Sequence, residues 1–416
     1  MGLGRRRRAA VAVAAVLALA GSAVVIHRVL APAEVSTVAR VGWPAPGTPP
    51  VGVVGRLPAA PLIVDGRLRV YAADRQVYAD QPADARARVT PFWSYRRWPA
   101  RLAGVLAEGT TVVSRWSDGT LVALDGRTGR VAWRADGPAP DGGHPARRTG
   151  AATVWDPGGL AVGRGADGGS VLVVSGGGRL RGYALADGRE RWHAEGDRSC
   201  RTDLGTTAAG QAVSVDACAG TPVVEFRDVT TGTVGLRWRP PAASAGTTVT
   251  PVGCLTPRSR CRALRTAGPG AAAGRGWLVG GGAPVAAPAL DAEGTVLAGE
   301  LAVGMNGPVL TGWGARTGKE RWRRGDLGRV RILAAQPGRL HVLTEGRDLV
   351  TLDPVTGAQR SRFPFTWSDE GFAYRPGMAY AADGYLAVER LREDATPDDD
   401  DQGWFLTPEP VLLAAT

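Results

Sequence analysis

The sequence predicts an all-β chain that folds as a β-propeller behind a single N-terminal transmembrane helix. Two observations lead to this prediction. A phrase ending in an aromatic residue recurs about every 40–45 residues, and an uncharged run of 18 residues follows four arginines near the N-terminus. A period of that length, with several short strands in each unit, is typical of propellers. The 59 glycines and 30 prolines also argue against long helices beyond the anchor.

Residues 1–30 are predicted to be a cytoplasmic arginine cluster followed by a signal anchor. Arg5–Arg8 precede residues 9–26, "AAVAVAAVLALAGSAVVI", which are just long enough to cross the apolar core of a bilayer. Arginines on this side place the N-terminus inside and the remainder outside the cytoplasmic membrane. The Ala18–Ala20 site also suits signal peptidase, and cleavage near Ala20 would give a secreted protein. We favour the uncleaved single-pass anchor because the apolar run continues beyond that site.

Residues 31–58 are predicted to be a linker, because prolines and glycines interrupt any helical or strand period there. The propeller is expected to occupy residues 59–416. It begins with strand-and-turn patterns such as "LIVDGRLRVYAAD" at 62–74, in which an Asp-Gly turn separates two strands.

The recurring phrase places a glycine turn a few residues before an aromatic residue. In "LVALDGRTGRVAW", at 121–133, two strands flank the Thr-Gly turn, and glycine permits a positive φ there. A buried tryptophan at the end would wedge one blade against the next. The predicted turn glycines are Gly129, Gly188, Gly232, Gly318 and Gly357. The predicted wedges are Trp93, Trp133, Trp192, Trp238, Trp277, Trp322 and Phe363.

The spacing of the wedges leaves seven or eight blades open. Successive steps are 40, 59, 46, 39, 45 and 41 residues, and the long step contains a glycine-rich insertion at 137–169. Strands expected within 378–391 and 405–416 either form an eighth blade or complete the first blade by pairing with N-terminal strands. Such closure would remove exposed sheet edges. Eight blades are favoured over seven.

Four cysteines form two local pairs, Cys200 with Cys218 and Cys254 with Cys261. Four cysteines allow three connectivities, and spacing alone does not choose among them. We expect the local pairing, as structural disulfides in an oxidising compartment. Neither pair has the C-x-x-C spacing of redox or zinc sites.

The net charge of +11 does not by itself predict nucleic-acid binding. Lys319 is the only lysine, five arginines belong to the N-terminal segment, and the other basic residues are dispersed. Nucleic-acid binding requires a clustered basic patch.

The phrase resembles the PQQ-like repeat of quinoprotein alcohol dehydrogenase-like β-propellers. The pattern of this repeat is similar to that of WD40 and YVTN propellers. It stands at Leu121–Trp133, Leu180–Trp192, Pro308–Trp322 and Leu349–Phe363, and the resemblance covers about residues 60–415. This family contains PQQ-dependent dehydrogenases and the non-enzymatic lipoprotein of the outer-membrane barrel-assembly machine. The enzymatic branch would imply PQQ held between a tryptophan and a disulfide of adjacent cysteines, with calcium and an aspartate base. Adjacent cysteines are missing, so no catalytic residue, cofactor site or metal site is carried over.

Other motifs in the sequence are better explained by structural roles than by metal, nucleotide or calcium binding. His27, His144, His193 and His341 are scattered, so a histidine metal site is not expected. "GRGADG" at 163–168 matches G-x-G-x-x-G but precedes a strand, whereas dinucleotide binding needs a following helix. The acidic run at 398–401, with Glu393 and Asp394 upstream, lacks the glycine spacing of a calcium loop. Four further tryptophans, Trp98, Trp116, Trp155 and Trp367, are expected to pack beneath loops, or to serve as binding anchors.

The sequence therefore predicts a membrane-anchored extracytoplasmic propeller that binds an envelope protein or peptide, without catalysis and without nucleic acid. Two alternatives stay open: a PQQ-dependent dehydrogenase-like enzyme and a ligand-sensing ectodomain.

Overall fold

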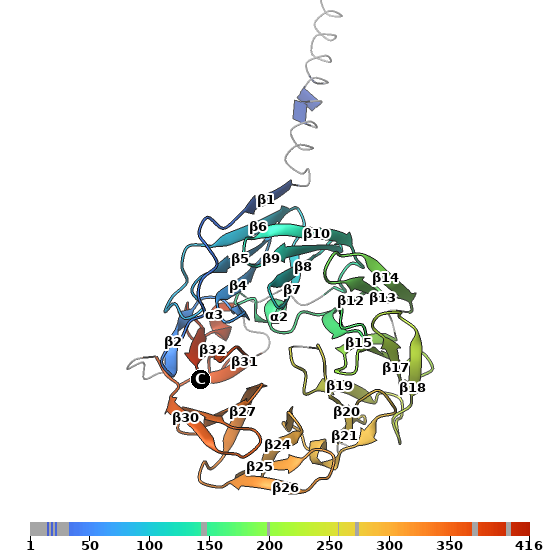
Figure 1. Cartoon of the computed structure of the whole chain (residues 1–416), viewed down its shortest axis with the longest axis vertical. Helices are drawn as coiled ribbons and strands as arrows, with labels where there is room; N and C mark the ends of the chain where they lie inside the picture. The colour runs from blue at the N-terminus through green and yellow to red at the C-terminus, as the bar shows by residue number, and fades with distance from the viewer. Residues whose placement is uncertain are drawn as a thin grey trace, which may run out of the picture.

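The computed structural model describes residues 33–416, apart from 143–147, 198 and 199, 257, 271–273, 368–372 and 397–400, together with residues 15, 18, 19, 21 and 22. Eight antiparallel sheets surround a central axis (Figure 1). The predicted eight-bladed propeller is confirmed. Most of the predicted anchor lies outside the described residues. Within the part that is described, no helix has the length and apolar character needed to cross a membrane.

Each blade begins with its innermost strand and ends at the rim (Figure 1). The first four blades consist of β3 (Leu62–Val64), β4 (Leu68–Ala73), β5 (Gln76–Asp80) and β6 (Trp93–Trp98); β7 (Leu102–Glu108), β8 (Thr111–Trp116), β9 (Thr120–Asp125) and β10 (Arg130–Asp136); β11 (Leu160–Arg164), β12 (Ser170–Gly176), β13 (Arg179–Ala184) and β14 (Glu190–Glu195); β15 (Arg201–Thr206), β16 (Gln211–Asp216), β17 (Val223–Asp228) and β18 (Val234–Trp238).

The other four blades consist of β19 (Thr248–Val252), β20 (Ala263–Ala267), β21 (Arg275–Leu278) and β22 (Val285–Ala286); β23 (Val296–Ala298), β24 (Leu301–Asn306), β25 (Val309–Gly314) and β26 (Glu320–Arg324); β27 (Val330–Gln336), β28 (Arg339–Thr344), β29 (Asp348–Leu352) and β30 (Gln359–Pro364); and β31 (Arg375–Ala382), β32 (Tyr385–Leu391) and β33 (Val411–Ala415). Short helices α2 (Ala151–Val154), η1 (Pro288–Leu290) and α3 (Asp401–Trp404) lie in connections.

The stretch expected to be a linker contributes two strands. Here the structure differs from the domain boundaries inferred from the sequence. β1 (Ala33–Thr37) pairs with β6 and makes the first blade five-stranded, and β2 (Gly52–Leu57) pairs with β33 as the outermost strand of the eighth blade. The prolines at 44, 46, 49 and 50 lie between these strands, so they remove no ladder donor from either. The eighth blade is therefore closed by strands from both ends of the described chain.

The core lies between blades and not on one side of a single sheet. All seven residues of β32 and all five of β33 are buried. Strands covered on both faces read as continuous apolar runs, which explains sequences such as "VLLAA". The largest apolar cluster joins the first, second and eighth blades.

Four of the predicted wedges have the same environment. Trp93, Trp133, Trp192 and Trp322 lie on the last strand of their blade and reach the turn of the next blade. Their indole Nε1 atoms donate to the carbonyls of Gly126 (2.7 Å), Leu185 (2.8 Å), Val229 (2.6 Å) and Pro354 (3.0 Å). Their rings lie against Gly129, Gly188, Gly232 and Gly357, each with a positive φ. Any side chain at these glycines would enter the ring.

The other three aromatic residues depart from this arrangement. Trp277 lies on β21, the third strand of its blade, and its Nε1 donates to Thr266 Oγ1 of that blade at 3.0 Å. Trp238 is half-buried and packs edge-to-face on Trp277, with ring centroids 5.1 Å apart. Phe363, on β30, packs against the core of the eighth blade. Because β22 is only two residues long and has no tryptophan, nothing lies within 4 Å of a Cβ placed on Gly318 of the sixth blade.

Candidate functional site

The most unusual connection of the ring is the loop between β19 and β20, which we call the axial loop (residues 253–262). It turns toward the centre of the ring (Figure 1). A disulfide between Cys254 and Cys261 closes it, and the second disulfide joins Cys200 to Cys218. The predicted local pairing of the cysteines is therefore confirmed.

The backbone of the axial loop lies on the inner strands of the third and fourth blades. Thr206 N donates to Arg258 O and Cys261 N donates to Thr206 O, both at 2.8 Å. Ser259 Oγ accepts from Val162 N at 2.9 Å. Gly205, with φ +101°, lies directly under the carbonyl of Arg258, and a side chain there would collide with it. The loop thus depends on a glycine in a strand of another blade.

Two ion pairs extend from the axial loop toward the second and third blades. Arg258 donates from Nε and Nη2 to the two carboxylate oxygens of Asp156, at 2.7 and 3.3 Å. Arg260 Nη2 donates to Glu108 Oε2 at 2.7 Å. Both arginines have a positive φ, 56° and 54°, which is uncommon outside glycine, asparagine and aspartate. The hydrogen bonds and ion pairs hold the loop in this conformation.

The axial loop contributes to the lining of several cavities along the axis of the ring. A cavity of about 330 Å³ lies where β3, β7, β27 and β31 end, and Leu255 and Thr256 of the loop line it. A larger cavity of about 820 Å³ lies where β7 and β15 begin, and Arg258 lines it. We call the larger one the arginine cavity. Its charged lining residues come from the first four blades and the axial loop: Asp74, Arg101, Arg115, Asp141, Asp156, Arg179, Arg201, Asp203, Arg227 and Arg258.

Arg115 is the centre of one wall of the arginine cavity. It lies on β8, is 1% exposed, and donates to the carbonyls of Pro138 (2.9 Å), Ser175 (2.6 Å), Gly158 and Gly159 (both 3.2 Å). Burial lowers its pKa to about 10, so it stays protonated at neutral pH. This guanidinium joins the glycine-rich insertion to the third blade and shapes the wall.

Asp203, on β15, forms part of the floor of the arginine cavity. Its carboxylate accepts from Ser175 Oγ at 3.0 Å and from Gly205 N at 3.1 Å. Burial raises its pKa, although both hydrogen bonds and the nearby Arg258 and Arg115 act in the opposite direction. Burial thus favours the neutral form of Asp203, whereas its hydrogen bonds and the two arginines favour the charged form.

A second wall is built around Glu225, which is buried on β17. It accepts from Arg227 Nη2 (2.7 Å), Arg237 Nε (2.9 Å) and Arg201 Nη2 (3.4 Å). Burial opposes ionisation of Glu225, but the three arginines outweigh it and lower its pKa. Of these three arginines, Arg201 and Arg227 line the cavity, and Arg201 also pairs with Asp216 at 3.1 Å. Their guanidinium groups on this wall are therefore held in place by carboxylates.

Three potential metal ligands lie close together near this wall. In the described part of the chain, the one grouping with metal-ligand proximity is Cys200, Asp216 and Cys218. Its two sulfur atoms are bonded to each other. The Asp216 carboxylate accepts from Arg201 and from Cys218 N. These donors are therefore already engaged.

The remaining sequence candidates lie elsewhere. His193 is exposed on β14, 3.0 Å from Glu190, and His341 is buried on β28, whereas His27 and His144 lie outside the described residues. Residues 163–168 span the turn between β11 and β12, without a helix. Glu393 and Asp394 pair with Arg347 and Arg392, and residues 398–400 are not described.

The four additional tryptophans divide into two groups. Trp116 and Trp155 are buried in the core. Trp155 stacks on Tyr380, with ring centroids 5.9 Å apart. Trp98 and Trp367 are partly accessible at the rim, and each lies near an arginine, Arg75 and Arg56 respectively.

The described residues do not fit the PQQ site that the resemblance implies. That site would use a disulfide between adjacent cysteines, but the two disulfides here join residues separated by 18 and 7 positions. Trp155, the tryptophan on α2's C-terminal side, is 2% exposed and has one face on Tyr380. We therefore derive no chemistry from this cofactor.

The sequence did not predict the arginine cavity, because its lining residues are spread over positions 74 to 258. In the sequence, its arginines cannot be told apart from ordinary surface arginines. The one usable signal was the pair of cysteines seven positions apart in the weakest repeat, which marks a stabilised loop.

Comparisons with known proteins give one matching family model and several similar solved structures. Residues 50–153 and 91–255 match the family model described as "Outer membrane protein assembly factor BamB". No curated protein sequence matches. Among solved structures, BamB from Moraxella catarrhalis is 14% identical, with a TM-score of 0.45, over 92% of this chain and 96% of that one. The designed protein Ika8 is 13% identical, with a TM-score of 0.46, over 88% and 99%. A europium-containing methanol dehydrogenase is 12% identical, with a TM-score of 0.44, over 93% and 94%.

Proposed function

The chain is a β-propeller of PQQ-like repeats, and from this premise we propose that it is a membrane-anchored, extracytoplasmic scaffold that binds an envelope protein without catalysis. The matched family model is described as an outer-membrane protein assembly factor, which supports a role in assembly or docking. The N-terminal arginines and apolar run support the anchor.

The observation that carries the proposal is the arginine cavity. Six arginines and four aspartates line it, the pKa of Asp203 is raised, and the arginines are positioned by carboxylates, carbonyls and the axial loop. A rigid concave surface with positioned guanidinium groups suits an extended segment with acidic or carbonyl groups, because arginine forms directional hydrogen bonds to both. We place the docking site of the partner segment in this cavity.

Affinity isolation of the full chain from its own membranes, followed by quantitative mass spectrometry, tests this docking site. Arg101→Glu/Arg179→Glu reverses charge at the accessible edge of the cavity, where the Arg179 side chain is 54% exposed. The control is Arg316→Glu/Arg321→Glu, on exposed residues of the sixth blade. We expect at least one membrane protein to be enriched with the native chain and the control but lost from the cavity variant. Equal recovery with all three proteins contradicts the docking site.

The non-catalytic part of the proposal has a separate test. The purified chain is supplied with PQQ and calcium and assayed for dye reduction with alcohols and sugars. We expect no turnover above that of the cofactor alone. Turnover that depends on the protein would establish the quinoprotein alternative.

A further inference from the structure

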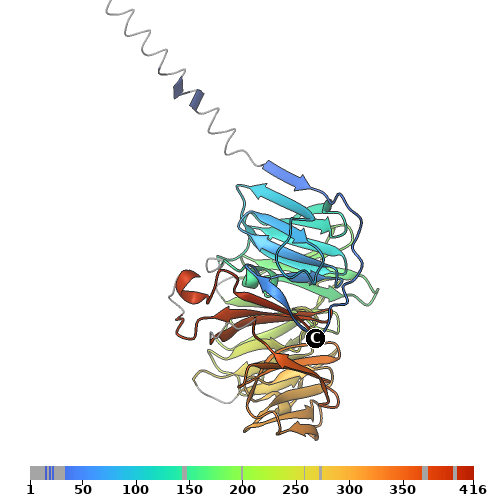
Figure 2. The ribbon, with the colours of Figure 1, turned by 90° about the vertical axis from the view of Figure 1, so that its left-hand side faces the viewer.

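The rim of the first blade carries an exposed basic and aromatic surface next to the point where the chain leaves the predicted anchor. We call it the blade-1 flank: Val35, Arg75, Arg96 and Trp98. Val35 is 59% exposed and Trp98 is 36% exposed, so both are among the few large apolar side chains that the described chain leaves open. Figure 2 shows β1 at one end of the ring seen edge-on.

The ladder register places the residues of the blade-1 flank together. Val35 on β1 is paired with Arg96 on β6, and Ala33 is paired with Trp98. Directly paired residues point to the same face of a sheet. Arg75, in the turn between β4 and β5, lies over the Trp98 ring at 4.2 Å from its centroid. A shallow hollow of about 320 Å³ lies here, lined by residues 73–76 and 96–98.

β1 is fixed to the ring through its other face. Glu34 accepts from Arg97 Nε of the first blade at 3.2 Å and from Arg134 Nη2 of the second blade at 2.6 Å. Ala39 N donates to Thr128 O of the second blade at 2.9 Å. The first described residue of β1 therefore has a defined position on the rim.

This position limits how far the blade-1 flank can lie from the bilayer. The predicted apolar run ends at Ile26 and β1 begins at Ala33, seven residues later. Seven residues span at most about 25 Å when fully extended. Since Ala33 is the ladder partner of Trp98, the flank lies within reach of the headgroup region.

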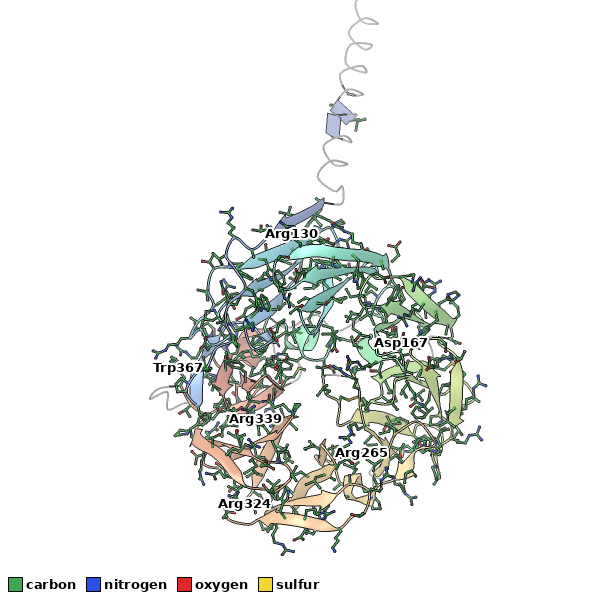
Figure 3. All side chains as sticks on the ribbon, viewed as in Figure 1. Arg130, Asp167, Arg265, Arg324, Arg339 and Trp367 are labelled. Carbon is green, nitrogen blue, oxygen red and sulfur yellow. A yellow bond between two sulfur atoms is a disulfide. The ribbon has the colours of Figure 1, made fainter. Side chains whose placement is uncertain are left out.

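The charge of the surrounding rim favours an anionic surface. Arg40, Arg96, Arg127 and Arg130 are exposed and have no carboxylate partner among the described residues, and Arg130, at the start of β10, lies near β1 (Figure 3). Unpaired arginines attract anionic headgroups over about 10 Å at ordinary ionic strength. Tryptophan prefers the interface between headgroups and acyl chains, where its ring is both apolar and able to donate a hydrogen bond.

We propose that the blade-1 flank rests on an anionic phospholipid surface, so that the ring stands on its rim with its axis along the membrane plane. This rests on the proposed anchor but does not depend on the docking site. Asp74 and Arg101, which line the arginine cavity, flank this surface in sequence. The orientation therefore brings the edge of the cavity close to the membrane and presents it to membrane-bound partners.

The test uses the full chain reconstituted in phosphatidylcholine vesicles, with or without phosphatidylglycerol, that contain brominated lipid as a quencher. The difference between native protein and Trp98→Phe isolates the emission of Trp98. Trp367→Phe is the matched control, because Trp367 is also a partly accessible rim tryptophan near an arginine, and it lies elsewhere on the ring (Figure 3). We expect most of the Trp98 emission to be quenched in anionic vesicles, with less quenching in neutral vesicles or at high salt, and little quenching of Trp367.

A charge-reversal pair completes the test. Arg75→Glu/Arg96→Glu should abolish the excess quenching of Trp98 in anionic vesicles. Equal quenching of Trp98 and Trp367, or quenching that ignores phosphatidylglycerol, overturns the proposal. A chain that fails to float with vesicles overturns both the anchor and this contact, whereas a failed docking site changes only partner recovery.

Discussion

The indole of Trp322 lies against Gly357 of the next blade, 2.6 Å from an ideal Cβ at that glycine, and its Nε1 donates to Pro354 O at 3.0 Å. This single contact combines apolar burial, a hydrogen bond and a backbone conformation with φ +71°. The indole of one blade and the glycine turn of the next therefore join the two blades.

Replacing Trp322 with alanine should strongly destabilise the ring. The substitution removes a buried indole and leaves a cavity between two blades, at a cost of about 3–5 kcal/mol. The half-buried Trp238 is the comparison, because it makes no such contact with a turn glycine. Trp238→Ala should therefore cost less. Urea denaturation of the two variants measures the difference, and equal losses would contradict the wedge role.

Alanine substitutions at the turn glycines Gly357 and Gly318 distinguish the stability cost of backbone strain from the cost of a collision with the wedge tryptophan. Both have a positive φ, 71° and 64°, so alanine costs about 1–2 kcal/mol at either position. Only at Gly357 would the new methyl group also collide with a tryptophan, because nothing lies near Gly318. We expect Gly357→Ala to lower the thermal midpoint clearly more than Gly318→Ala. Similar midpoints would mean that the turn conformation alone sets the cost.

Removing the disulfide of the axial loop should loosen it locally. In the chain-entropy model, closing so short a loop contributes roughly 2–3 kcal/mol. For Cys254→Ser/Cys261→Ser we expect a loss of that order and faster hydrogen exchange of the amides of Thr206 and residue 261. Cys200→Ser/Cys218→Ser is the control, and it should lose comparable stability without faster exchange at these two amides.

Acid should destabilise the seventh blade through His341. Gln336 Nε2 lies 2.9 Å from His341 Nε2, and Gln336 Oε1 accepts from Gly384 N, so the amide group presents a donor to the imidazole. Burial lowers the pKa of His341 to about 3, against about 6.5 for an unfolded histidine. The unfolded chain therefore binds more protons between these values, and this contribution to stability is complete above about pH 6.5 and falls as pH decreases toward 3.

Denaturation at a series of pH values checks this dependence. His341→Gln should flatten the decline in stability between about pH 6.5 and 4. His193→Gln, at an exposed position, should leave the native slope unchanged. A slope that is the same in all three proteins would assign the acid sensitivity to other groups.

The fold could be predicted from the sequence because each blade repeats one local pattern. The turn glycine and terminal aromatic recur, and four of the aromatic residues occupy equivalent positions on last strands. The pattern failed in the fifth blade because Trp277 lies on the third strand, so equal spacing did not mean equal position. It also failed for β1 and β2, because strands that pair with distant partners need no repeat phrase of their own.

The candidate site could not be predicted in the same way. Arg115, Asp203 and Arg258 meet only because closure of the ring brings three blades and the axial loop together. Nothing in the local sequence distinguishes Arg115, whose guanidinium is held by four carbonyls, from the many exposed arginines. The cysteine pairs were predictable because a short separation favours local pairing.

The pairing of Gly52 with Ala415 determines when the ring can close during folding. Because β2 and β33 are far apart in the sequence, the ring can close only after every intervening blade has been synthesised. Until then, both strands have unpaired edges, which are open to pairing with other chains. A folding chain therefore passes through a late, open-ring state whose lifetime should govern how much protein is lost to aggregation or proteolysis. Single-residue changes in β2 that leave the finished ring stable can still reduce the yield of folded protein.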